Sequence, residues 1–160
     1  MSQRKAFVEQ LEVLMDQDET VVLLLGDVGF SFIEPLMKKY PKRVINVGIG
    51  EQNMMGVAAG LSNVGMKPMV YTMKNFILLR PHEQLRNDIG FANANVKLFG
   101  VGGSEAYRFL GMSHNLFPGE EEDILKHIPN ITKHFPKTEE ETKELILKEY
   151  HRNGPSYFAI

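Results

Sequence analysis

One stretch decides the fold: Val44-Ile45-Asn46-Val47-Gly48-Ile49-Gly50-Glu51-Gln52-Asn53-Met54-Met55-Gly56-Val57-Ala58-Ala59-Gly60-Leu61. It reads as a short β-branched strand, a turn between glycines, and a helix of small and apolar residues. Gly48 and Gly50 permit a tight turn from strand to helix. Glu51 then falls at the start of the helix, where the positive end of the helix dipole favours a carboxylate. The stretch therefore predicts a strand–turn–helix unit of an α/β fold.

The predicted helix carries apolar residues around most of its circumference, so we expect it to be buried rather than half-exposed. Gly56, Ala59 and Gly60 would let a second backbone approach closely. A single acid on such a helix has two explanations. Glu51 either stabilises its own helix, by about 0.3–1 kcal/mol, or has a chemical role.

Helices and strands alternate along the rest of the chain. We expect helices over residues 3–16, 35–40, 51–63, 76–92, 120–127 and 139–151, and strands over residues 21–25, 43–47, 69–72, 96–101, 131–135 and 157–160. Pro81 should kink or restart its helix, and Thr138 with Glu141 fits a capping box. The long loop over residues 102–119 is of a kind that is usually functional. The alternation predicts a six-stranded, mostly parallel sheet flanked by helices on both faces.

Composition limits the possible functions. With 160 residues we expect a single domain over residues 1–160. A net charge of −2 gives no sign of binding to nucleic acid or to an anionic membrane. The absence of cysteine excludes disulfides and thiolate metal sites. No apolar run approaches the length of a membrane span, so we expect a cytoplasmic protein. We also expect no metal site in this chain.

The run Gly48-Ile49-Gly50-Glu51-Gln52 resembles a segment of transketolases and deoxyxylulose-phosphate synthases and, less closely, of the beta subunits of pyruvate-dehydrogenase-type decarboxylases. The resemblance is to their pyrimidine-binding module and extends from Arg4 to Ile160. It implies that Glu51 hydrogen-bonds the pyrimidine ring of thiamine diphosphate and activates this cofactor, which itself performs the difficult chemistry.

A second segment, residues 68–76, supports the resemblance. The family carries an aromatic residue eight positions after Pro68 that stacks on the aminopyrimidine, and this position is Phe76. Arg80 and the helix after it also resemble the family, with one extra residue between Phe76 and Arg80. His82 lies where the family often has an aromatic residue, and Asp27 matches an aspartate that ends the first strand. The resemblance thus implies that Phe76, Arg80, His82 and Asp27 contact the cofactor.

A third segment, Gly111-Met112-Ser113-His114, resembles the Gly-Pro-Thr-His of transketolases. It implies that His114 binds substrate oxygens and assists proton transfer, a role that suits a group titrating near neutrality. Arg4 and Ser31 fall on positions with which transketolases bind the phosphate of the acceptor. The remaining histidines of the second half match no motif, and we expect them to be solvated: His127, His134 and His151.

The chain also departs from the family at the substrate positions. Gly102 stands where the family has a histidine, and Leu110 stands where it has an aspartate that reads a sugar hydroxyl. A phosphate-binding arginine of the family would lie beyond Ile160. Recognition of phosphate and hydroxyl groups is therefore altered or supplied by another chain.

Taken together, the resemblance implies the small subunit of a split transketolase, which transfers a two-carbon ketol unit between a ketose and an aldose. A partner chain would bind the diphosphate and Mg²⁺, and two small subunits would dimerise around the Glu51 helix within an α2β2 assembly acting on sugars or sugar phosphates. Three alternatives stay open: a subunit of a synthase or decarboxylase that uses a 2-oxo acid, a non-catalytic regulatory partner, and an unrelated nucleotide-binding domain. Against the nucleotide-binding alternative, the sequence lacks a glycine-rich phosphate loop of the usual spacing.

Overall fold

The protein is built on one parallel β-sheet. The structure is a computed structural model that describes residues 2–29, 31–102 and 107–160. In these ranges six strands pair in the order β2-β1-β3-β4-β6-β5, and every pair is parallel. The strands are β1 Val21–Leu25, β2 Val44–Asn46, β3 Lys67–Met73, β4 Lys97–Val101, β5 Thr132–His134 and β6 Ser156–Ala159. The predicted α/β class and strand order along the chain are confirmed, with differences only at the strand ends.

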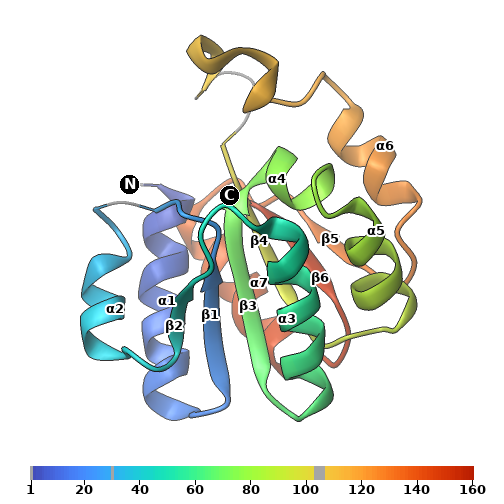
Figure 1. The fold of residues 1–160 in the computed structure, drawn as a ribbon. Coiled ribbons are helices and arrows are strands. Elements are labelled where there is room, and N and C mark those ends of the chain that lie inside the picture. Colours follow the sequence, from blue (N-terminus) through green and yellow to red (C-terminus); the bar gives the residue numbers. More distant parts are fainter. Residues whose placement is uncertain (1, 30, 103–106) are drawn as a thin grey trace.

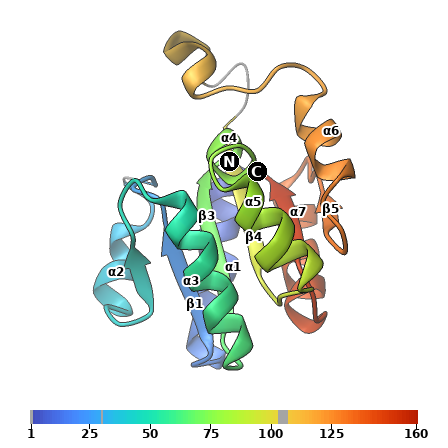
Figure 2. The same cartoon turned by 45° about the vertical axis from the view of Figure 1, so that its right-hand side comes forward.

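Helices cover both faces of the sheet (Figures 1 and 2). They are α1 Gln3–Gln17, α2 Glu34–Lys39, α3 Glu51–Asn63, α4 Lys74–Leu78, α5 His82–Gln84, α6 Glu120–Lys126 and α7 Glu139–His151, with a π-helical segment η1 Leu85–Phe91 and a 3₁₀ segment η2 Arg108–Ser113. One core contains side chains of α1, α2 and α7, and the other contains side chains of α3, α4, η1 and α6. The sheet is therefore the middle of three layers.

The buried run of β1 shows why these residues form a central strand. Val21, Leu23 and Leu25 pack on the α1 side, whereas Val22 and Leu24 pack on the α3 side, and all are buried. Alternate side chains of a strand point to opposite faces, so a sheet covered on both sides needs a continuous apolar run. Each such side chain contributes about 1.5–3 kcal/mol through its burial.

The order of the strands creates a switch point at the carboxyl edge of the sheet. The chain passes from β1 outward to β2 and returns to β3 on the other side of β1. Open α/β sheets bind their ligands outside the carboxyl ends of the strands at such a point. Asp27 follows β1 here and α4 follows β3, so the candidate residues of both segments reach one edge.

The amino edge of the sheet carries a different polar cluster, centred on Asp18. Its carboxylate accepts hydrogen bonds from Lys67 Nζ at 2.8 Å, from Tyr150 Oη at 2.7 Å and from Thr20 Oγ1 at 2.6 Å. Burial by itself would raise the pKa of Asp18, but the hydrogen bonds outweigh burial and hold that pKa well below its usual range. Asp18 thus ties the start of β1 to β3 and α7.

Lys97, the first residue of β4, is buried at the same edge. Its ammonium group donates to the carbonyl oxygens of Arg152 at 2.9 Å and Gly154 at 2.6 Å. Burial lowers the pKa of Lys97 to about 8, because removal from water disfavours the charged form.

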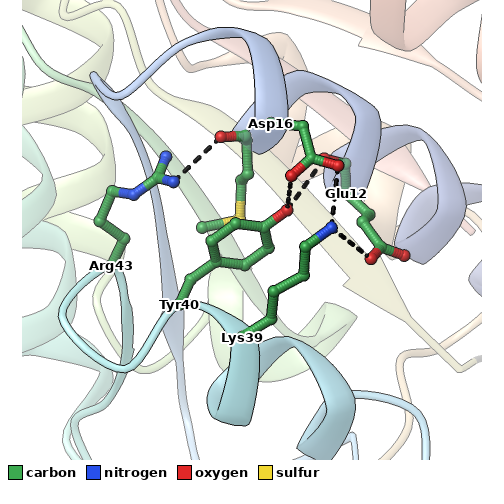
Figure 3. A network of polar contacts seen from close by, with 6 residues as sticks. Glu12, Asp16, Lys39, Tyr40 and Arg43 are labelled. Carbon is green, nitrogen blue, oxygen red and sulfur yellow. Dashed lines mark hydrogen bonds and ion pairs between the residues drawn. The ribbon is translucent and has the colours of Figure 1, made fainter.

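A further network joins α1 to the end of α2 (Figure 3). Lys39 Nζ lies 2.9 Å from Glu12 Oε1 and 2.8 Å from Asp16 Oδ2, and Tyr40 Oη donates to Asp16 Oδ1 at 2.6 Å. The guanidinium of Arg43 donates to the backbone of α1 and β1 and lies 4.8 Å from the centre of the Tyr40 ring. These contacts hold α2 beside the amino half of the sheet.

Two expectations are corrected by the structure. Helix α3 is half-exposed, with Gln52, Asn53, Gly56, Val57 and Gly60 on its open face, so the prediction of a buried helix is wrong for this chain by itself. Its apolar content is high, but only one side packs on the sheet. His134 is not solvated: it stacks on Phe158 with ring centres 4.8 Å apart and lies 3.1 Å from the buried carboxylate of Glu149.

The expected helix over residues 76–92 is broken at Pro81 into α4, α5 and η1. Proline has no backbone N–H and clashes with the preceding turn, which explains the break. The expected capping box of α7 is present in one direction, since Thr138 Oγ1 accepts from Glu141 N at 3.1 Å. The Glu141 carboxylate instead accepts from Lys137 N.

Candidate active site

The site begins at the turn between β2 and α3. Gly48 has φ +70°, a conformation that favours glycine, and Gly50 precedes the helix, which starts at Glu51. Glu51 is only 4% exposed although it carries a carboxylate. A buried carboxylate requires a partner. The turn therefore places a strong hydrogen-bonding group at the carboxyl edge of the sheet, as the sequence predicts.

Arg80 is that partner. Its Nη1 lies 2.7 Å from Glu51 Oε1, and its guanidinium carbon lies 3.5 Å from the centre of the Phe76 ring. Phe76 belongs to α4, which follows β3, and is 6% exposed. The structure thus brings three predicted cofactor residues, from two separate segments, into one contact group. The Arg80 side chain is 39% exposed, so the group has a buried acid and a solvent-facing cation.

A cavity of about 500 Å³ opens beside this group. It is lined by Ile49, Gly50, Glu51, Gln52, Asn53 and Arg80. The ion pair is therefore accessible from a concave surface large enough for a small ligand.

His114 approaches the same group from η2, which lies above the carboxyl edge of the sheet in Figures 1 and 2. Its ring meets that of Phe76 edge-on with centres 5.2 Å apart, and its Nδ1 lies 2.7 Å from Ser113 Oγ. The side-chain amide of Asn75 donates to the Ser113 carbonyl at 2.6 Å, which fixes this segment to α4. His114 thus lies next to Phe76 and is only partly buried.

A second cavity, of about 320 Å³, has His114 in its lining. We name it the Arg4 cavity; it is lined by Arg4, Asp27, Val28, Gly29, Phe32, Tyr71, Met73, Val101, Tyr107, Leu110 and His114. Arg4 Nη1 lies 3.4 Å from Tyr107 Oη, and burial raises the pKa of Tyr71 to about 12 against the opposing effect of the Arg4 charge. Arg4, from the first turn of α1, therefore lines the same cavity as His114.

The remaining predicted residues have different positions. Asp27 has φ +54° and is held by Asn46, whose Oδ1 accepts from Asp27 N at 3.1 Å. Ser31 is exposed with φ +72°, its N–H donates to the carboxylate of Glu34 at the start of α2, and it does not line the Arg4 cavity. His82 Nδ1 lies 3.1 Å from the Leu78 carbonyl and lines neither cavity. The roles of these residues, like those of the other predicted site residues, stay predictions.

Three residues of the site were missed by sequence reasoning. Tyr71 lies within the motif of residues 68–76, and its place in the same motif as Phe76 was the signal that could have identified it. Asn75 is 5% exposed, and its Oδ1 has no hydrogen-bond partner among the described residues. Tyr107 lies in the long loop. No local pattern pointed to Tyr107, because its partner Arg4 is 103 residues away in sequence.

Two negative findings apply to the part of the chain that the structure describes. It contains no group of three or more His, Cys, Asp or Glu side chains that could hold a metal ion. Within the same residues, every helix is too short or too polar to cross a bilayer.

Comparison with known proteins gives consistent matches. The family model described as transketolase, pyrimidine binding domain, matches residues 1–160. An uncharacterized 33.6 kDa protein in the fasciation locus of Rhodococcoides fascians is 32% identical over 155 residues, which are 97% of this chain and 49% of that protein. An apulose-4-phosphate transketolase subunit of Actinobacillus succinogenes is 31% identical over 142 residues, which are 89% of this chain and 45% of that protein.

A solved structure described as "Split gene transketolase, inactive beta4 tetramer" has a TM-score of 0.87 and 31% identity, and the match covers 99% of this chain and 50% of that chain. The chain therefore spans about half the length of these relatives.

Proposed function

Because this chain belongs to the transketolase family, as its pyrimidine-binding domain, we propose that it supplies one half of a thiamine diphosphate-dependent active site. The reaction would transfer a two-carbon ketol unit from a ketose to an aldose. The observation that carries the proposal is the contact group of Glu51, Arg80 and Phe76 beside an open cavity. It combines a buried carboxylate, at the start of α3 where the sequence predicts it, with an aromatic ring.

The residues present fit the pyrimidine half of the cofactor. Glu51 would hold the pyrimidine ring nitrogen, and Phe76 would offer its ring face for stacking. Arg80 now contacts both groups, so a ligand that uses both must compete with this guanidinium. When bound, thiamine diphosphate supplies the nucleophilic carbon on which ketol transfer depends. Asp27, at the end of β1, would contact the cofactor from the neighbouring strand.

Substrate would lie next to His114. The imidazole is partly buried, meets Phe76 edge-on and faces the Arg4 cavity, so it can donate or accept a proton at a substrate oxygen. Arg4 would bind an anionic end of the acceptor at the far side of that cavity, through charge-assisted hydrogen bonds.

A partner would complete the site. The described residues offer no acidic cluster for a metal, so we assign Mg²⁺ and the diphosphate group to a diphosphate-binding subunit. Large apolar side chains stand exposed around the site, among them Ile49 at 78%, Phe109 at 82% and Phe117 at 62%. Exposed apolar side chains gathered at one edge favour a protein-covered surface.

The open face of α3 has the shape that a homodimer core requires. A Cβ atom on Gly56 or Gly60 would meet no atom within 4 Å in the described part of the chain, so a second backbone could approach there. Two copies joined along α3, each with one diphosphate-binding subunit, give the proposed α2β2 assembly for sugar or sugar-phosphate substrates. The cytoplasmic location expected from the sequence is kept as part of this proposal.

The test is Glu51→Gln in the complex reconstituted with a diphosphate-binding subunit. The amide keeps the shape of the side chain but cannot supply the acid proton, so ketol transfer should fall by about two orders of magnitude or more. Glu140→Gln is the matched control, because Glu140 lies exposed in the first turn of α7, away from the site. Unchanged turnover of Glu51→Gln would exclude the assigned role.

A further inference from the structure

The Arg4 cavity has walls that are unusual for a polyhydroxylated ligand. Together with His114, its lining includes Leu110, Met73 and Val101, whose side chains offer no strong hydrogen-bonding group. A sugar hydroxyl buried against such a wall would lose its hydrogen bonds to water without replacement, which is unfavourable. The part of the acceptor that lies against these side chains is therefore expected to carry few hydroxyls.

Three aromatic rings also line the cavity. Phe32, Tyr71 and Tyr107 all line the cavity, and Tyr71 is 1% exposed. The guanidinium carbon of Arg4 lies 5.7 Å from the centre of the Phe32 ring. Aromatic walls favour a flat apolar ligand, which they can contact by stacked or edge-to-face packing.

Tyr107 occupies its place because of Gly102. An ideal Cβ on Gly102 would lie 2.7 and 2.8 Å from two carbons of the Tyr107 ring, so this ring excludes a side chain at residue 102. The backbone of Gly102 has φ +84°, which also favours glycine. The Tyr107 hydroxyl then reaches Arg4, and the backbone carbonyl of Tyr107 accepts a hydrogen bond from the side-chain amide of Asn115 at 2.9 Å. Tyr107 is thus a fixed part of the wall.

Charge in the cavity is limited. Among the described lining residues Arg4 is the permanent cation, and it forms no ion pair with another described residue. Asp27 lines the same cavity and disfavours additional negative charge near it. The balance suits a ligand with one anionic group, placed at the Arg4 end.

We propose that the Arg4 cavity receives an acceptor aldehyde with one anionic group and an apolar, aromatic body, and that Tyr107 is the residue that sets this preference. This rests on the proposed ketol transfer and replaces the aldose by such an aldehyde as its acceptor. In that reaction the aldehyde carbon gains a carbon–carbon bond and its oxygen takes up a proton to become a hydroxyl. The carbon–carbon bond broken in the donor ketose supplies the electron pair, and the donor hydroxyl that loses its proton becomes the aldehyde of the released aldose.

The proposal is tested by equilibrium binding to the full chain, measured by NMR titration. Alcohol analogues are used because aldehydes react with lysine. The probes are 4-(hydroxymethyl)benzoate, 4-(hydroxymethyl)phenyl phosphate, neutral benzyl alcohol and ribitol 5-phosphate. At least one aromatic anion should bind about tenfold more tightly than ribitol 5-phosphate and than benzyl alcohol. The two aromatic anions distinguish a carboxylate from a phosphate as the preferred charge.

Variants connect the preference to its residue. Tyr107→Ala should weaken binding of the aromatic anion about fivefold or more, and Tyr107→Phe, which keeps the ring, should retain the preference over ribitol 5-phosphate. Phe109→Ala is the matched control, because Phe109 belongs to the same segment, is 82% exposed and does not line the cavity. Tyr107→Phe also serves if Tyr107→Ala fails to fold.

Equal or tighter binding of ribitol 5-phosphate would overturn the proposal, as would the absence of saturable binding by both aromatic anions. An unchanged preference in a folded Tyr107→Ala would overturn the assignment of Tyr107. None of these readouts involves turnover. Failure of ketol transfer in the reconstituted complex is therefore distinguishable from failure of this inference.

Discussion

The Glu51–Arg80 ion pair should stabilise the fold unequally through its two members. Arg80→Met removes the partner of a carboxylate that is 4% exposed, whereas Glu51→Gln removes the partner of a guanidinium that is 39% exposed. An arginine with that exposure can turn its charge toward water. The carboxylate at the start of α3 cannot, so we expect Arg80→Met to be the more destabilising substitution.

The magnitude follows from the burial of the pair. Removing one member of a fully buried ion pair costs about 3–5 kcal/mol, whereas an exposed pair contributes about 0–1 kcal/mol. Because one member is buried and the other is partly exposed, we expect a loss of about 2 kcal/mol for Arg80→Met. Loss of the contact with Phe76 adds about 0.5–1 kcal/mol. Glu51→Gln should cost about 1 kcal/mol, since the amide still accepts a hydrogen bond.

The measurement is guanidinium-induced unfolding followed by far-ultraviolet circular dichroism, because the chain contains no tryptophan. The double variant completes a thermodynamic cycle, in which we expect a coupling energy of about 1–2 kcal/mol. Lys126→Met is the control: it breaks an ion pair whose members are 65% and 70% exposed, and the free energy of unfolding should change by less than about 0.5 kcal/mol. If Arg80→Met costs no more than Glu51→Gln, the reasoning about unequal burial is refuted.

Three further predictions concern pH and substrate. Folding lowers the pKa of Asp18, so its stabilising effect is present above its unfolded pKa and is lost as the pH falls below about 4. In acid denaturation the free energy of unfolding of Asp18→Asn should therefore fall less steeply with decreasing pH than that of the wild type. The pKa of Lys97 is lowered to about 8, so between that pH and about 10.4 only the unfolded chain holds the proton. The free energy of unfolding of the wild type should therefore rise across this window relative to Lys97→Met, and a constant difference would contradict this account. In steady-state kinetics of the reconstituted complex, His114→Ala should lower kcat, whereas Arg4→Ala should raise only KM for an anionic acceptor; a change of KM alone in both variants would make His114 a binding group.

Much of the fold could be predicted because its signals are local. Glycine spacing placed the turn before Glu51, proline broke the helix at residue 81, and apolar runs marked the strands. The burial of α3 could not be predicted in the same way. Hydrophobic content shows that a helix has apolar sides, but only the packed structure shows that a Cβ atom on Gly56 or Gly60 would meet no atom of the described residues within 4 Å.

The candidate site also has a part that local motifs predict and a part that they do not. Glu51, Phe76 and Arg80 belong to short motifs, and the structure brings them together. The wall of the Arg4 cavity depends on contacts between distant segments, as between Arg4 and Tyr107. The contact of Arg80 with both Glu51 and Phe76 could not be predicted either, because it depends on how the side chains pack and not on a local sequence pattern.

The two edges of the sheet offer separate targets for engineering and for evolution. Asp18 and Lys97 lie at the amino ends of the strands, whereas Glu51, Phe76 and Tyr107 lie beyond the carboxyl ends. β3 has 7 residues, so these edges are about 20 Å apart. Substitutions at that separation usually act additively. Libraries that raise heat resistance can therefore be restricted to the amino edge, while exchange of the loops at the opposite edge diversifies the substrates on an unaltered scaffold.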